Sequence, residues 1–152
     1  MMKKMKVESF VVNGFTARTT NQQEMDVEKA RIPGLWRQFL EVVEVDPSSA
    51  LKGYGVYSNY QSDWQGAYDI TVGTDGDFTA RERVSITIPA GTFLCFETTG
   101  SMPHAVLELW EQVWKFFQEE GAPQRTYQCD FEEYRSLDSA AIYISIEGGS
   151  HE

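Results

Sequence analysis

Cysteine and histidine are the scarcest of the reactive residues in this chain, with two of each in 152 residues. Cys95 and Cys129 are far apart and form no Cys-x-x-Cys motif, so we expect buried free thiols in a reducing compartment. His104 stands at the start of an expected helix and His151 near the end of the chain, a spacing that gathers no metal ligands. The sequence therefore predicts no metal, and no cofactor motif accompanies these residues.

Basic residues are also scarce: 13 Lys and Arg stand against 23 Asp and Glu, which gives a formal net charge of −10. Nucleic-acid binding depends on a cationic surface that neutralises phosphates, so we expect no nucleic-acid partner. The acidity favours cationic or neutral partners. The same composition also fits an acidic surface that only keeps a protein soluble.

Long hydrophobic runs are missing as well. The basic opening MMKKMK is followed by VESFVVNGF, in which Glu8 and Asn13 interrupt the apolar residues. We therefore expect no signal peptide, no membrane partner and a cytoplasmic location. What the chain has in abundance is aromatic residues, namely nine Phe, seven Tyr and four Trp. Tyr and Trp combine an apolar ring with a polar group, which suits a binding cavity as well as a core.

A phrase that occurs twice organises the sequence. Leu-Trp-x-Gln begins at Leu35 and again at Leu109. At this spacing, or one slightly longer, GVYSNY matches CDFEEY, YDITV matches IYISI, and VVNGFTA matches TIPAGTFLCF. Each half therefore has the pattern strand, helix, strand, strand, and the chain is expected to be one domain over residues 1–152 with pseudo-repeats at about 1–78 and 79–152.

Apolar residues at helical spacing mark one helix in each half. The first stripe is Leu35, Trp36, Phe39, Leu40 and Val43, and the second is Val106, Leu109, Trp110, Val113, Trp114 and Phe117. Pro33 is either a first-turn proline or a kink in a weaker helix that starts near Asp26. Ser101 is the expected cap of the second helix. Two such halves predict an α+β fold, in which a pseudo-twofold axis relates duplicated units, one antiparallel sheet carries both helices on one face, and a groove separates the helices.

Four segments, IPGLWRQF, GVYSNYQSDWQGAYD, IPAGTFLCFETTG and DFEEYRS, together resemble the GyrI-like family, also called the AraC-type effector-binding domain. The resemblance runs from about Val7 to Ile146. It implies the duplicated fold and the ligand-sensing role that such domains have in bacterial multidrug-responsive transcription regulators. The regulators also carry a DNA-binding domain, for which this chain has neither the room nor the basic composition. We therefore expect a stand-alone member.

The resemblance also implies a binding residue. In regulators of this type, an acidic residue within an aromatic pocket receives lipophilic cations. The family's Phe-Glu-x-Tyr phrase falls on Phe131, Glu132 and Tyr134, so Glu132 is the implied counter-charge. Other family phrases fall on Tyr57, Tyr60, Asp63, Gly66, Tyr68 and Asp69.

The pattern around Glu132 is compatible with this role. Side chains alternate along a strand, so Asp130, Glu132 and Tyr134 share one face. The repeat makes Ser58 the counterpart of Glu132, and we expect Ser58 and Tyr60 on the same face near the axis. A carboxylate among aromatic rings costs several kcal/mol to desolvate unless it is paired, protonated or met by a ligand cation. The alternative is a surface glutamate at an edge of the sheet.

The tryptophans have two interpretations each. Trp36 and Trp110 are related by the repeat and are expected to flank the groove together, although aromatic residues at helical spacing also suit a core. Trp64 lies in a polar loop and is either a lid over the groove or folded onto the surface. The candidate ligand-binding residues are therefore Glu132, Tyr134, Tyr60, Tyr57, Trp36, Trp110, Trp64 and Tyr68.

No nucleophile and base are placed together by a motif, so no catalytic residue is assigned. We expect a binding module that senses or sequesters amphipathic cationic small molecules, with a separate regulator protein or a second copy of the chain as candidate partners. Two alternatives stay open through the resemblance. Some GyrI-like proteins hydrolyse electrophilic small molecules with a pocket glutamate and an aromatic hydroxyl, and others act by binding a topoisomerase.

Overall fold

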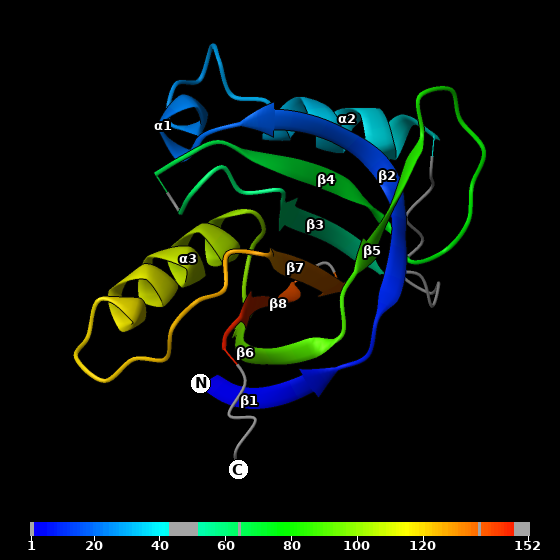
Figure 1. The fold of residues 1–152 in the computed structure, drawn as a ribbon. Coiled ribbons are helices and arrows are strands. Elements are labelled where there is room, and N and C mark those ends of the chain that lie inside the picture. Colours follow the sequence, from blue (N-terminus) through cyan, green and yellow to red (C-terminus); the bar gives the residue numbers. More distant parts are fainter. Residues whose placement is uncertain (1, 43–51, 64, 137, 148–152) are drawn as a thin grey trace.

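A single antiparallel sheet of eight strands is the frame of the protein (Figure 1). The computed structural model describes residues 2–42, 52–63, 65–136 and 138–147. The strands are β1 (Met2–Val7), β2 (Phe10–Thr19), β3 (Gly53–Ser58), β4 (Tyr68–Thr74), β5 (Val84–Ile88), β6 (Gly91–Thr99), β7 (Cys129–Ser136) and β8 (Ser139–Ser145). The helices are α1 (Asn21–Glu24), α2 (Ile32–Val42) and α3 (His104–Phe117). None of these helices has the length and apolar content that a membrane crossing needs.

The strand order across the sheet, β1-β6-β8-β7-β3-β4-β2-β5, is symmetric. If β1 to β4 exchange their labels with β5 to β8, respectively, the order read from the opposite edge of the sheet is the same. The expected α+β fold with duplicated units on one sheet is therefore confirmed. Each unit also has one strand more than the sequence pattern indicated, namely β1 in the first unit and β5 in the second. Each of these strands pairs with a strand of the other unit, β1 with β6 and β5 with β2. The expected boundary near residue 78 lies in the connection between β4 and β5, and superposing the two halves remains its test.

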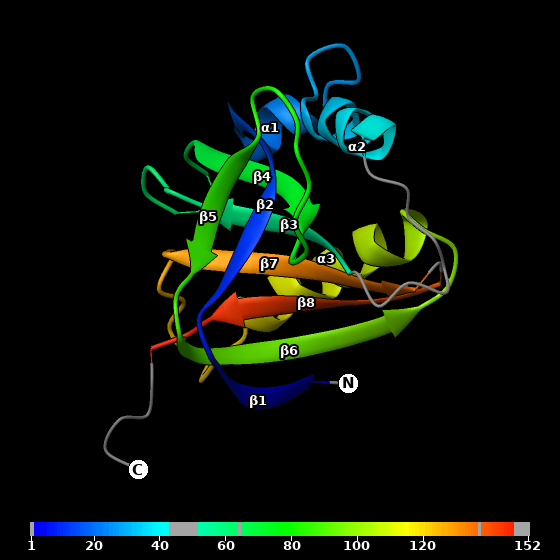
Figure 2. The ribbon, with the colours of Figure 1, turned by 90° about the vertical axis from the view of Figure 1, so that its right-hand side faces the viewer.

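Both long helices cover the same face of the sheet, as Figures 1 and 2 show. Helix α2 packs on β2 and β4, and α3 packs on β6 and β8. The buried residues Leu35 and Phe39 of α2 belong to one apolar cluster with Phe15 and Ile70, while α3 forms a second cluster with β6 and β8. Tyr57, on the central strand β3, packs against both helical clusters, so the two clusters meet over the middle of the sheet.

The ends of the helices settle two local questions. Helix α2 begins at Ile32, so Pro33 is a first-turn proline rather than a kink. Helix α3 begins at His104 without a side-chain cap, and the backbone carbonyl of Ser101 accepts a hydrogen bond from the Ala105 N–H instead. The expected Ser101 side-chain cap is therefore wrong.

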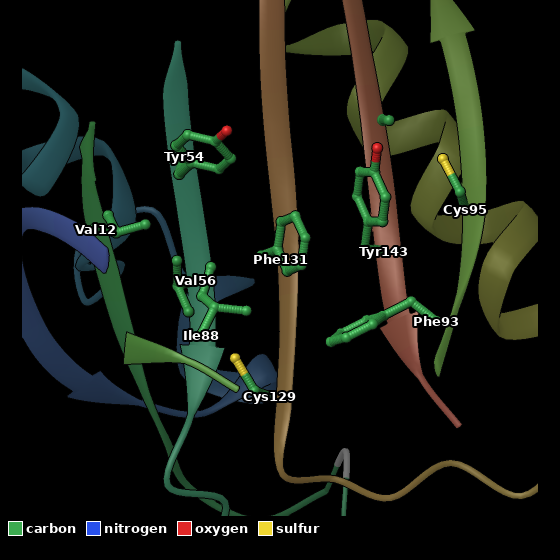
Figure 3. Packing of buried hydrophobic residues seen from close by; sticks show 10 residues of the cluster. Val12, Tyr54, Val56, Ile88, Phe93, Cys95, Cys129, Phe131 and Tyr143 are labelled. Carbon is green, nitrogen blue, oxygen red and sulfur yellow. The ribbon is translucent and has the colours of Figure 1, made fainter. Parts of the chain in front are cut away.

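The opposite face of the sheet has its own apolar cluster (Figure 3). The rings of Phe131 and Tyr143 stack there, with 4.5 Å between their centroids. Cys95 and Cys129 are both buried free thiols, as expected, and lie on strands that β8 separates. Burial, with a smaller contribution from the Asp130 carboxylate, raises the pKa of the Cys129 thiol to about 12, so this thiol is a poor nucleophile.

Candidate functional site

Glu132 lies at the centre of the sheet, on the face that carries the helices. It belongs to β7, which pairs with β3 at the middle of the strand order, and its residue is only 5% exposed. Gly55 stands directly opposite on β3, and a Cβ atom there would come within 2.8 Å of the Glu132 Oε1 atom. The glycine therefore leaves the space that the carboxylate occupies.

Three neutral donors hold the Glu132 carboxylate. The Tyr57 hydroxyl and the Trp110 indole N–H donate to Oε2 at 2.8 and 2.6 Å. The Tyr134 hydroxyl donates to Oε1 at 2.8 Å. Within the described ranges no Lys, Arg or His forms an ion pair with Glu132. The carboxylate is thus hydrogen-bonded, but its charge has no partner of opposite sign.

The environment shifts the acidity of these groups. Burial raises the pKa of Glu132, and the hydrogen bonds from Trp110, Tyr134 and Tyr57 act in the opposite direction. Burial and then the negative charge of Glu132 raise the pKa of Tyr57 and of Tyr134 well above the usual range for tyrosine. Both tyrosines therefore keep their protons and remain donors. A positive charge nearby would stabilise the ionised form of Glu132.

A cavity of about 340 Å³ lies beside this cluster, between α3 and the segment that contains α1 and the start of α2. This volume is within the range of small-molecule sites. Its aromatic walls are Tyr57, Tyr60, Tyr68, Trp110 and Trp114, and its acidic residues are Glu24 and Glu111. We call this cavity the groove. Glu132 does not line the groove directly, because Tyr57 and Trp110 stand between its carboxylate and the open space.

Most of the candidate residues come together here. Of the eight, Tyr57, Tyr60, Tyr68 and Trp110 line the groove, and Glu132 and Tyr134 lie behind its wall. Trp36 is not a lining residue. Its ring packs edge-on against Tyr134, with centroids 5.0 Å apart, so only Trp110 of the repeat-related pair reaches the groove. Trp64 lies outside the described residues.

One expected neighbour of Glu132 is wrong. Ser58 pairs with Cys129, whose side chain belongs to the cluster on the opposite face of the sheet. Tyr57 takes the expected place of Ser58 and contacts Glu132. The physical reason is the two-residue period of a strand, since an alignment that is wrong by one residue moves each side chain to the other face.

The whole of this architecture matches a family of effector-binding proteins. The model of Cass2, an integron-associated effector binding protein, matches residues 5–146. The chain belongs to the Cass2 family. Because the family is one of effector-binding proteins and solved structures of this fold match the chain over almost its whole length, the expected relation to GyrI-like effector-binding domains is confirmed.

Two relatives and one further solved structure show what the chain is similar to. The integron cassette protein VCH_CASS2 of Vibrio cholerae is 34% identical, with a TM-score of 0.89, and the match covers 96% of this chain and 95% of that one. YobU of Bacillus subtilis, which carries the name of a transcriptional regulator protein, is 32% identical over 80% of this chain and 78% of its own length. The structure of SAV2435 bound to tetraphenylphosphonium has a TM-score of 0.66 at 18% identity, covering 100% of this chain and 97% of that one, and shows that the fold is shared.

Two charged residues of the present protein, Asp130 and Arg125, were not among the candidate site residues predicted from the sequence. Asp130 is fully buried, and its Oδ2 atom accepts hydrogen bonds from the Tyr60 hydroxyl at 2.6 Å and from Arg125 at 2.7 Å. Arg125 lines the groove. Strand alternation had placed Asp130 on the same face as Glu132, which was a usable signal. Arg125 follows α3 in an irregular segment, where no periodicity indicates the direction of a side chain.

Proposed function

We propose that this protein binds amphipathic small-molecule cations in the groove and that Glu132 supplies the counter-charge. The observation that carries the proposal is the state of Glu132, a buried carboxylate with three neutral donors and no ion-pair partner within the described ranges. Burying a carboxylate in this way costs several kcal/mol. A ligand cation recovers part of that cost, whereas a neutral molecule of the same shape does not.

The walls of the groove favour the same ligands. Each Tyr or Trp face that meets a cation contributes about 0.5–2 kcal/mol of cation–π attraction. Tyr57 and Trp110 are well placed for this, because each also donates a hydrogen bond to Glu132, which increases the electron density of its ring. Glu24 and Glu111 add negative charge at the groove. The net charge of −10 attracts cations over a longer range.

The relatives support this chemistry. SAV2435, which shares the fold, was solved with tetraphenylphosphonium, a lipophilic cation. The name of YobU supports a regulatory use, in which a separate regulator protein or a second copy of the chain receives the signal. The buried free thiols fit a cytoplasmic location.

A comparison of matched ligands tests the proposal. N-methyl para-phenylpyridinium carries one positive charge, and para-methylbiphenyl has nearly the same shape without a charge. Isothermal titration should give clearly tighter binding of the cation. The preference should shrink in Glu132→Gln and persist in Glu8→Gln, which removes an exposed carboxylate outside the groove. Equal affinity of the two ligands for the unmodified protein would reject the proposal.

The geometry favours binding over hydrolysis. A general base needs a direct path to the proton that it removes. The Glu132 oxygens already accept three hydrogen bonds, and Tyr57 and Trp110 separate them from the groove. Hydrolysis of electrophiles therefore receives no support from these contacts, which do not bear on the binding of a topoisomerase. The titration of matched ligands tests the leading function independently of both.

A further inference from the structure

A second carboxylate lies next to Glu132 on the same face of β7. Asp130 precedes Glu132 by two residues, a separation of about 7 Å along a strand. Its Oδ1 atom accepts the Ser145 N–H at 2.9 Å, and its Oδ2 atom accepts the Tyr60 hydroxyl at 2.6 Å. In contrast to Glu132, Asp130 has a cation at hydrogen-bond distance, because Arg125 Nη2 lies 2.7 Å from Oδ2.

The surroundings of Arg125 resemble those of a bound ligand. Its guanidinium lies 4.3 Å from the ring centroid of Tyr127 and 5.6 Å from that of Phe117, so aromatic rings flank the charge. Its side chain is 6% exposed and lines the groove. Its Nε atom is buried with no hydrogen-bond partner among the described residues. Arginine–carboxylate pairs are frequently bidentate, whereas the contact of Arg125 with Asp130 runs through Nη2.

We propose that Arg125 is a built-in cation that fills a second acidic, aromatic subsite of the groove and thereby restricts the site to ligands with a single positive charge. The proposal rests on the proposed function, since it assumes that Glu132 receives the charge of a ligand. Two neighbouring carboxylates would otherwise attract a dication of matching length. With Asp130 already neutralised, the second charge of such a ligand would meet the guanidinium and be repelled.

The test adds a dication to the matched ligands. N,N′-dimethyl bipyridinium with para-linked rings has nearly the shape of N-methyl para-phenylpyridinium but carries a charge at each end. The unmodified protein should bind the monocation at least about tenfold more tightly than the dication, as a repulsion of about 1.4 kcal/mol produces. In Arg125→Ala, which removes the guanidinium and frees its space, the dication should gain at least about tenfold in affinity. The monocation, which the proposal places beside Glu132 rather than Asp130, should gain less than the dication, so the ratio of the two affinities is the readout.

Three variants control for fold and net charge. Arg125→Ala with Asp130→Asn has the same net charge as the unmodified protein and no second carboxylate, so the dication should gain clearly less than in Arg125→Ala alone. Arg125→Lys keeps the charge and should keep the preference for the monocation. Arg125→Gln retains a donor for the buried Asp130, so it replaces Arg125→Ala in the test if a thermal melt shows that Arg125→Ala does not fold. In that case the dication should gain relative to the monocation in Arg125→Gln.

The outcomes separate the two proposals. If the monocation binds and depends on Glu132, but the ratio of dication to monocation affinity is the same in Arg125→Ala and the unmodified protein, the role of Arg125 is wrong and the proposed function stands. If the dication gains equally in the variant that also carries Asp130→Asn, the second subsite is likewise rejected. If the monocation binds no better than para-methylbiphenyl, the proposed function itself fails.

Discussion

Replacing Glu132 with glutamine separates the charge of the site from its shape. The glutamine carbonyl can accept the hydrogen bonds from Tyr57 and Trp110 that Oε2 accepts now. Its amide then faces the Tyr134 hydroxyl, which can rotate and accept a hydrogen bond instead of donating one. The network therefore survives with one reversed bond, and the variant should fold.

The size of the effect follows from where Glu132 lies. Tyr57 and Trp110 separate its carboxylate from the groove, so a ligand cation sits one ring layer away, at about 7 Å. With an effective dielectric constant of about 20, two unit charges at this distance attract by about 2 kcal/mol. Glu132→Gln should therefore weaken binding of a lipophilic cation by about 30-fold. A direct contact would cost more, up to about 5 kcal/mol.

The matched neutral ligand provides the control. It should change by less than about threefold, since it loses no charge–charge attraction, and the useful quantity is the difference between the two ligands. Isothermal titration is preferable to fluorescence here, because Trp110 and Trp114 line the groove and any ligand can quench them. Equal losses for both ligands would mean that Glu132 supports the fold of the groove, and no loss for either would place the ligand elsewhere. Turnover of an electrophilic ligand that disappears in the variant would instead favour a hydrolase.

Further predictions concern pH, packing and DNA. The pKa of Glu132 is raised, so cation affinity should fall as the pH drops through that raised pKa. Titrations at several pH values should show that the midpoint of this fall lies at higher pH in Tyr57→Phe, which lacks one donor to the carboxylate. In the absence of ligand, the stability of the folded protein has the opposite pH dependence. The raised pKa of Glu132 contributes stability at low pH, and this contribution is lost as the pH rises through the pKa in the folded protein. Denaturant melts of the unmodified protein and of Glu132→Gln at several pH values measure this difference. Gly55→Ala should lower the free energy of unfolding by about 1–3 kcal/mol, because the new Cβ atom would lie 2.8 Å from Glu132 Oε1. The control is Gly34→Ala within α2, where the nearest atom to the new Cβ is at 3.8 Å, and this variant should be neutral or stabilising. A gel-shift assay at physiological salt should detect no binding to duplex DNA, and a tight, salt-sensitive complex would contradict the inference drawn from the net charge.

The sequence predicted those parts of the fold in which the spacing of apolar side chains indicates which side is buried. Leu35 and Leu109 belong to two apolar stripes, and both are buried. Strand β1 was missed, because MKKMKV has the lysines that protect an exposed edge and no clear apolar face. The match of Tyr57 with Phe131 paired two aromatic residues that lie on opposite faces of the sheet. The residue types alone could not show that this alignment was wrong, since aromatic rings line both faces of the sheet.

The same distinction separates the two carboxylates of the site. The phrase around Glu132 and its position between Phe131 and Tyr134 indicated a buried acid among aromatic rings, and the structure places it there. Whether such an acid is left without a cation depends on every other chain segment that passes near it. Arg125 follows α3 in an irregular segment and reaches Asp130 rather than Glu132 by virtue of the tertiary fold alone. A sequence can therefore locate the acidic strand β7, but the position of Arg125 in the fold decides which of Asp130 and Glu132 has an ion-pair partner.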